Sequence, residues 1–197
     1  MDLENPIKVI TIGELGVGKT SILNQMIFGM MEDTLRKLDV NTWKTRVDDV
    51  EYKVEMHDTG GMEKYFPMRK YYYKDAKIVL LVFDFNKRET FDKLKFWDKE
   101  MKKYKNNEEY CVFVVGTKYD ILDAATTEEE INDFCDDNGY QWAIIPLVQD
   151  IACYDINNFF KKAIAKYVRG EYIKKHPSQL WLFNKEKKNK IRNNQCV

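Results

Sequence analysis

Residues 13–20 read Gly-Glu-Leu-Gly-Val-Gly-Lys-Thr, and this stretch decides the fold. It fits the pattern G-x-x-x-x-G-K-[ST], whose glycines let backbone N–H groups curl around phosphate oxygens. A β-branched run, residues 7–12, precedes it, and a helical pattern from Thr20 to Met30 follows it. A phosphate-binding loop needs this order of strand, loop and helix, because the helix N-terminus adds partial positive charge. The alternative is a glycine turn that only joins strand to helix.

Each position of this loop has an expected role. Lys19 places a point charge on the phosphates, and the hydroxyl of Thr20 can ligate Mg²⁺. The backbone of the neighbouring residues supplies the remaining donors. The nucleotide-binding residues expected from the loop are Glu14, Leu15, Gly16, Val17, Gly18, Lys19, Thr20 and Ser21.

Short β-branched or apolar runs recur along the chain and alternate with helical patterns. Two of the runs are separated only by Asp48-Asp49, which predicts an antiparallel hairpin at a sheet edge. The predicted strands are 7–12, 42–47, 50–56, 78–83, 110–115 and 143–147, and the later predicted helices are 91–101, 127–138 and 156–168. This alternation predicts an α/β fold: a mostly parallel six-stranded sheet with one antiparallel edge strand and helices on both faces.

Composition sets outer limits on function. The 32 basic and 32 acidic residues cancel, which argues against a nucleic-acid-binding surface. No apolar stretch approaches the length of a membrane span, and the acidic N-terminus lacks the apolar core of a signal peptide. The four cysteines lie far apart, which is typical of reduced thiols in a cytoplasmic protein. We expect one domain over residues 1–170 and a polar, lysine-rich tail over 171–197.

A second motif, Asp58-Thr59-Gly60-Gly61, ends the predicted hairpin. A carboxylate at a strand end can hold Mg²⁺, and the glycines let the backbone approach a γ-phosphate. An ordinary turn is the alternative, but the phosphate loop upstream favours the metal site.

Residues 116–120 read Gly-Thr-Lys-Tyr-Asp and follow a predicted strand. Here the chain resembles the Ras superfamily of small GTPases, in which an Asp at this position accepts hydrogen bonds from guanine and the Lys stem packs on the base. The resemblance implies that Asp120 and Lys118 select GTP over ATP. Thr117 replaces the usual Asn, as in the Rho branch.

The resemblance runs from about residue 7 to residue 168 and is closest to the Rab branch, through residues 71–76 and the Thr90-Phe91 and Trp97 positions. It implies a P-loop G domain that binds GTP and GDP with Mg²⁺ and switches between two states. It also implies effector and exchange-factor proteins as partners, a monomer, and a cytoplasmic protein peripheral on endomembranes in vesicle trafficking.

The catalytic positions that the family implies are Lys19, Gly61 and the Gln position, which is Met62 here. A thioether cannot orient the attacking water. Leu15 stands where the family has a small residue beside the γ-phosphate. Both changes predict feeble GTP hydrolysis; unselected drift at the two positions is the alternative.

Two further elements depart from the family pattern. In switch I an ungapped match puts Leu35 in place of the Thr that contacts Mg²⁺, with Thr34 and Thr42 as other hydroxyl candidates. The last base-binding element matches Gln149-Asp150-Ile151, where the backbone N–H could still bind guanine. We expect Asp150 and Ile151 to contact nucleotide that binds more weakly or exchanges faster than in typical relatives.

The tail carries one lipidation candidate, Cys196, after a basic run over 185–192 that would attract anionic lipid. The ending is not C-a-a-X, so an unmodified tail is the alternative. Two other functions stay open: a pseudo-GTPase scaffold with a vestigial nucleotide site, and an ATP-using P-loop enzyme, which Asp120 argues against.

Overall fold

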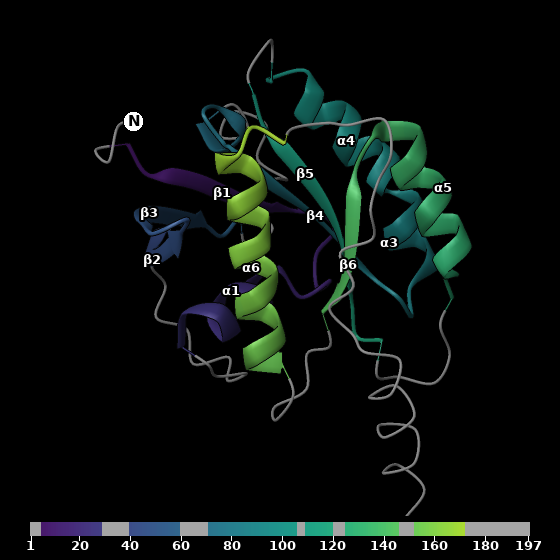
Figure 1. Ribbon diagram of the computed structural model, residues 1–197. Coiled ribbons are helices and arrows are strands. Elements are labelled where there is room, and N and C mark those ends of the chain that lie inside the picture. The colour runs from purple at the N-terminus through teal and green to yellow at the C-terminus, as the bar shows by residue number, and fades with distance from the viewer. Residues whose placement is uncertain are drawn as a thin grey trace, which may run out of the picture.

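The computed structural model describes residues 5–28, 40–59, 71–105, 109–119, 125–145 and 152–171. Within them, six strands form one sheet in the order β2-β3-β1-β4-β5-β6. The strands are β1 (Ile7–Ile12), β2 (Val40–Val47), β3 (Val50–His57), β4 (Ile78–Asp84), β5 (Cys111–Thr117) and β6 (Gln141–Ile145). Figure 1 shows the sheet running through the middle of the molecule, with β2 at one edge and β6 at the other.

The pairing confirms the predicted mixed sheet. β1 runs parallel to β3 and β4, and β5 runs parallel to β4 and β6. Only β2 and β3 pair antiparallel, through the turn at Asp48-Asp49. Every residue of β4 and of β5 is buried, because helices cover both sides of the central strands and allow continuous apolar runs there.

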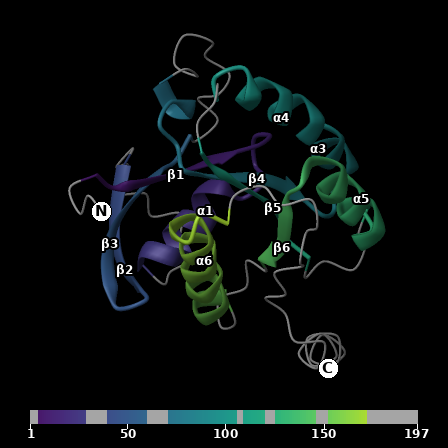
Figure 2. The same ribbon diagram turned by 45° about the horizontal axis from the view of Figure 1, so that its top comes forward.

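Helices cover both faces, as predicted. They are α1 (Lys19–Phe28), α3 (Arg88–Asp92), α4 (Leu94–Lys102), α5 (Glu128–Asn138) and α6 (Ala152–Val168). One hydrophobic core joins the sheet to α1 and α6, and a second joins it to α3, α4 and α5. Figures 1 and 2 show the two groups on opposite sides of the sheet. The α/β fold is therefore confirmed.

Several predicted boundaries were wrong, and three of them are instructive. The helix predicted over 91–101 is divided at Lys93, whose carbonyl accepts a tight i→i+3 bond from the amide of Phe96. β6 begins at Gln141 instead of residue 143, because this polar residue is buried and pairs with Phe113. α6 begins at Ala152, four residues before the predicted start.

The ends of α5 follow directly from sequence. The Thr127 side chain accepts a hydrogen bond from the Glu130 amide, and the Glu130 carboxylate accepts one from the Thr127 amide, which together form a capping box. The pKa of the Glu130 carboxyl is lowered to about 2, first by the hydrogen bond that it accepts from the Thr127 backbone and then by the one that it accepts from Arg88. Gly139 ends the helix in a left-handed conformation.

Two other expectations concern membranes and thiols. In the described part of the chain no helix has the length and apolar character needed to cross a bilayer. Cys111 and Cys135 are buried free thiols, and burial raises the pKa of Cys111 to about 11, so it stays protonated at neutral pH. The side chain of Cys153 and all of Cys196 lie outside the described residues.

Candidate functional site

The loop over 13–18 connects β1 to α1 at the carboxyl end of β1, where ligands of open α/β sheets bind. Gly13, Gly16 and Gly18 have positive φ angles of 148°, 77° and 98°. Gly13 is required for a second reason: a Cβ atom there would lie 2.2 Å from the carbonyl oxygen of Val82 in β4. The first glycine of the motif therefore lets the loop pack directly against the sheet.

A Gly13→Ala variant should lose about 3 kcal/mol or more of folding stability, because backbone strain adds to the clash with Val82. Gly16→Ala is the matched control: its φ is also positive, but a Cβ there meets no atom within 4 Å. It should lose only about 1 kcal/mol. Urea unfolding of both variants measures the difference, and equal losses would contradict the close-packing explanation.

Lys19 occupies the concave side of the loop. Its ammonium donates to the carbonyl oxygens of Gly13 (2.7 Å) and Glu14 (2.8 Å), and the residue is only 5% exposed. Lys19 is also the first residue of α1, and in this first turn the Ile22 amide donates to the Gly18 carbonyl at 3.0 Å. A buried positive charge at a helix N-terminus is suited to binding phosphate.

Thr20 and Asp58 meet although 38 residues separate them. The Thr20 hydroxyl donates to Asp58 Oδ2 at 2.6 Å. Asp58 directly follows β3, and the hydroxyl of its neighbour Thr59 donates to the Thr11 carbonyl at 2.8 Å, which holds this segment beside β1. A hydroxyl and a carboxylate oxygen are suitable Mg²⁺ ligands.

These two oxygens would not hold a metal alone. Among the residues that the structure describes, no cluster of three or more His, Cys, Asp or Glu side chains could hold an ion. Mg²⁺ commonly takes one or two protein ligands and completes its octahedron with water and substrate phosphates. The pair therefore fits a metal that arrives with a phosphorylated ligand.

The segment Thr117-Lys118 is hydrogen-bonded to the phosphate loop. Thr117 Oγ1 lies 2.6 Å from the Val17 carbonyl oxygen, and Lys118 Nζ donates to the Gly16 carbonyl at 2.7 Å. Lys118 also donates to Asp84 Oδ2 at 2.8 Å. The two motifs predicted to bind base and phosphate, a hundred residues apart in sequence, thus form one connected site.

Comparison with known proteins now bears on this site. A family model described as the Ras family matches residues 8–169. The chain belongs to the Ras family of small GTPases. This assignment agrees with the resemblance noted in the sequence and with its Rab-like character.

Relatives of this Ras-family chain include several Rab-related proteins. The probable Rab-related GTPase of Acanthamoeba polyphaga mimivirus is 30% identical over 168 residues, covering 82% of this chain and 76% of its own. Ras-related protein Rab-32D of Dictyostelium discoideum is 29% identical, covering 67% of this chain and 61% of its own. The human NF-kappa-B inhibitor-interacting Ras-like protein 1 is 30% identical, covering 69% of this chain and 70% of its own.

The structure adds residues that sequence reasoning missed in this Ras-family site. Asp84, at the end of β4, is only 2% exposed, and its carboxylate accepts hydrogen bonds from the Lys118 ammonium and from the backbone amide of Asn86. The Asn86 side-chain amide in turn donates to the Lys118 carbonyl at 2.7 Å. Glu14 accepts a hydrogen bond from the Trp97 indole at 3.1 Å. A carboxylate at a strand end was the only sequence signal for Asp84, and nothing local connected Trp97 to the loop.

His57, just before Asp58, is buried in β3. Burial, together with the positive charge of Lys8, lowers the pKa of His57, so the imidazole is neutral at pH 7. It is therefore a buried strand residue that carries no positive charge toward Asp58.

The predicted residues divide into three groups. Within the described part, the phosphate loop, Lys19, Thr20, Asp58, Thr117 and Lys118 are brought together, with Ser21 in the first turn of α1 and Leu15 64% exposed on the loop. Thr42 is not brought there: it lies within β2 opposite Glu55, three residues or about 10 Å before Asp58 along β3. The predictions that lie outside the described residues concern Thr34, Leu35, Gly61, Met62, Asp120, Asp150, Ile151 and Cys196.

Proposed function

We propose that this chain is a Rab-like molecular switch that binds GTP and GDP with Mg²⁺. The observation that carries the proposal is the pair of hydrogen bonds from Thr117 and Lys118 to the phosphate loop. They hold the strand end that carries the base-binding motif against the phosphate loop, so that one nucleotide could contact both. Membership of the Ras family supports the same function.

The proposed roles follow from the chemistry of each group. Lys19 neutralises phosphate charge, and Thr20 and Asp58 hold Mg²⁺. When bound, the metal supplies positive charge that stabilises the phosphate oxygens. Asp120 and Lys118 select guanine, with the backbone at Asp150-Ile151 completing the base site. Since the Lys19 ammonium bonds to loop carbonyls of the chain itself, binding a phosphate exchanges these bonds for stronger, charge-assisted ones.

Hydrolysis is proposed to be feeble because Met62 replaces the water-orienting Gln. Leu15 adds an exposed, branched side chain to the loop, where the family has a small residue beside the γ-phosphate. The catalytic contribution left to the chain is then phosphate charge neutralisation by Lys19 and a backbone donor at Gly61.

If these two residues cause the defect, a Met62→Gln, Leu15→Gly double variant should hydrolyse GTP at least about tenfold faster in single turnover. The matched control is Met62→Leu with Leu15→Gly, which opens the loop but restores no amide. Equal rates for the two double variants would show that Met62 is not the cause.

The remaining parts of the proposal concern the whole protein. Residues 1–170 form the G domain, and the lysine-rich tail over 171–197, with Cys196 as its lipidation candidate, provides contact with an endomembrane surface. A cytoplasmic, monomeric protein in vesicle trafficking, acting through effectors and an exchange factor, is the role that the Rab-like resemblance supports.

A pseudo-GTPase scaffold is the second candidate, favoured by the loss of Gln at Met62 and of Thr at Leu35. One relative is named for its interaction with an NF-κB inhibitor, which describes that protein by a protein contact. A chain that lacks the γ-phosphate contact would bind its partner with or without nucleotide.

The deciding experiment is to denature freshly purified protein and identify the released nucleotide by chromatography. We expect GTP at about one equivalent, because both binding motifs are present and hydrolysis is weak. GDP would mean that Met62 and Leu15 do not prevent turnover. Absence of any nucleotide, repeated without chelator, would overturn the switch proposal in favour of the scaffold.

A further inference from the structure

A pocket of about 420 Å³ lies between the edge strand β2 and helix α6. None of its lining residues belongs to the phosphate loop or to the Thr20-Asp58 and Thr117-Lys118 positions: the nearest strand pair, Trp43 opposite Val54, lies four residues or about 13 Å before Asp58. Figures 1 and 2 show α6 beside the edge strand β2, on the same face of the sheet as α1. Pockets of this size are typical of small-molecule sites.

The wall of the pocket contains a buried polar group with nothing to bind. Thr45 is 5% exposed, and its hydroxyl has no hydrogen-bond partner among the described residues. Leaving such a group unsatisfied costs about 1–3 kcal/mol. A ligand that offered it a hydrogen bond would recover part of that cost, so Thr45 points to an occupant with a polar group.

The charge of the pocket is positive. Lys44 is paired with Glu51 at 2.9 Å, and Arg46, opposite Glu51 in the hairpin, also helps to lower the pKa of that carboxyl, whereas Lys161 makes no ion pair within the described ranges. Asn157 and Asn158, one turn before Lys161 on α6, add amide donors. Three cations against one carboxylate, with several neutral donors, are complementary to an anion.

The pocket also has an aromatic wall and an open strand edge. Trp43 is half-buried and packs against the core under α6. Four consecutive residues of β2, 43–46, line the cavity, and successive strand residues face opposite sides, so the cavity wraps around the outer edge of the sheet. Backbone donors of the edge strand are therefore within its reach.

We propose that this pocket binds a small molecule in which an anionic group, phosphate or carboxylate, is joined to a flat ring. The anion meets Lys161 and the Thr45 hydroxyl, and the ring lies on Trp43; Arg46, whose side chain leaves the opposite face of β2, adds positive charge at the strand edge. This site is separate from the nucleotide site, and a ligand bound in it would contact both the β2–β3 hairpin and α6. The hairpin leads directly through β3 to Asp58, so occupancy bears on the same strand that supports the metal pair.

The test is a titration of full-length ¹⁵N-labelled protein, saturated with GDP and Mg²⁺, with phenyl phosphate and, separately, benzoate. We expect saturable shifts of the Thr45, Asn157 and Asn158 amides with a Kd of about 1 mM or below. The stronger of the two probes identifies the anion as phosphate or carboxylate. Benzyl alcohol, which keeps the ring without the charge, should bind at least about tenfold more weakly.

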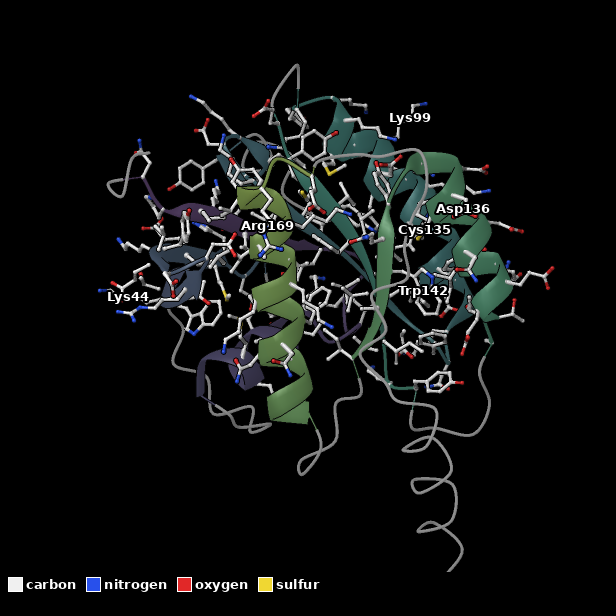
Figure 3. The ribbon with its side chains drawn as sticks, in the orientation of Figure 1. Lys44, Lys99, Cys135, Asp136, Trp142 and Arg169 are labelled. Carbon is white, nitrogen blue, oxygen red and sulfur yellow. The ribbon has the colours of Figure 1, made fainter. Side chains whose placement is uncertain are left out.

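Variants assign the binding to this pocket. Lys161→Gln should weaken binding of the stronger probe about fivefold, and Arg46→Gln should weaken it less, whereas Lys99→Gln, an equal charge change on α4 across the sheet, should leave binding unchanged (Figure 3). Thr45→Val should weaken binding of the probe without lowering the stability of the fold, since it removes an unsatisfied buried hydroxyl. No saturable shift with either probe, equal binding of benzyl alcohol, or an equal loss in Lys99→Gln would overturn the proposal.

These readouts do not depend on nucleotide binding. If the protein retains no GDP, the same titration is read at the pocket amides, whereas occupation of the phosphate loop by phenyl phosphate would shift the Gly16 and Lys19 amides instead. Failure of the pocket and failure of the nucleotide site are thus observed at different residues.

Discussion

A Lys19→Ala variant is expected to bind GTP and GDP at least about a hundredfold more weakly than the natural protein. Lys19 is 5% exposed, so its charge acts on a bound phosphate with little screening by water. The carbonyl groups of Gly13 and Glu14 that accept its hydrogen bonds are neutral, so these two bonds do not cancel that charge. Fluorescent GDP displaced by unlabelled GTP and GDP would measure both affinities.

The control must separate lost binding from lost folding. Lys99→Ala removes an exposed lysine on α4 and should leave nucleotide affinity and thermal stability unchanged. Lys19→Ala should also unfold at a temperature close to that of the nucleotide-free natural protein, because its bonds within the loop are ordinary donor-to-carbonyl contacts. A folded Lys19→Ala variant with affinity within threefold of natural would exclude the loop as the phosphate site.

The sheet and the loop were predictable because their signals are local. Residues 7–12 are a short β-branched run and residues 78–83 a continuous apolar run of the kind that suits a strand buried on both faces, and both strands occur where predicted. Asp48-Asp49 fixed the hairpin turn, and both residues adopt the positive φ that such a turn needs. The glycines of the loop likewise mark the positions of positive φ, and at Gly13 a side chain would also clash with the Val82 carbonyl.

Other features could not be predicted because distant residues determine them. Gln141 looks like a loop residue, yet its pairing with Phe113 places it in β6. The Phe91, Leu94, Trp97 and Met101 stripe is buried as predicted, but periodicity alone does not show the interruption at Lys93. The bonds of Trp97 to Glu14 and of Lys118 to Asp84 join residues 83 and 34 positions apart, and only the assembled sheet brings them together.

Asp120→Asn is the second change with a large expected effect. A carboxylate accepts hydrogen bonds from the two N–H groups on the edge of guanine, whereas an asparagine amide offers one acceptor and one donor. Xanthine carries an oxygen where guanine carries its amino group, so the amide fits xanthine. We expect GTP affinity to fall about a hundredfold and XTP affinity to rise by a similar factor.

Competition between GTP, XTP and ATP for the same site measures how far Asp120→Asn shifts the binding preference from GTP to XTP. Asp136→Asn, an equal charge change on the exposed face of α5, is the matched control and should leave all three affinities unchanged. Because Thr117 and Lys118 are held on the phosphate loop, a base bound near residue 120 and phosphates bound at Lys19 belong to one ligand. Unchanged GTP affinity in Asp120→Asn would therefore contradict the assignment of Asp120 to the base site, but not the assignment of the loop to the phosphate site. ATP outcompeting GTP in the natural protein would assign that phosphate site to an ATP-using P-loop enzyme.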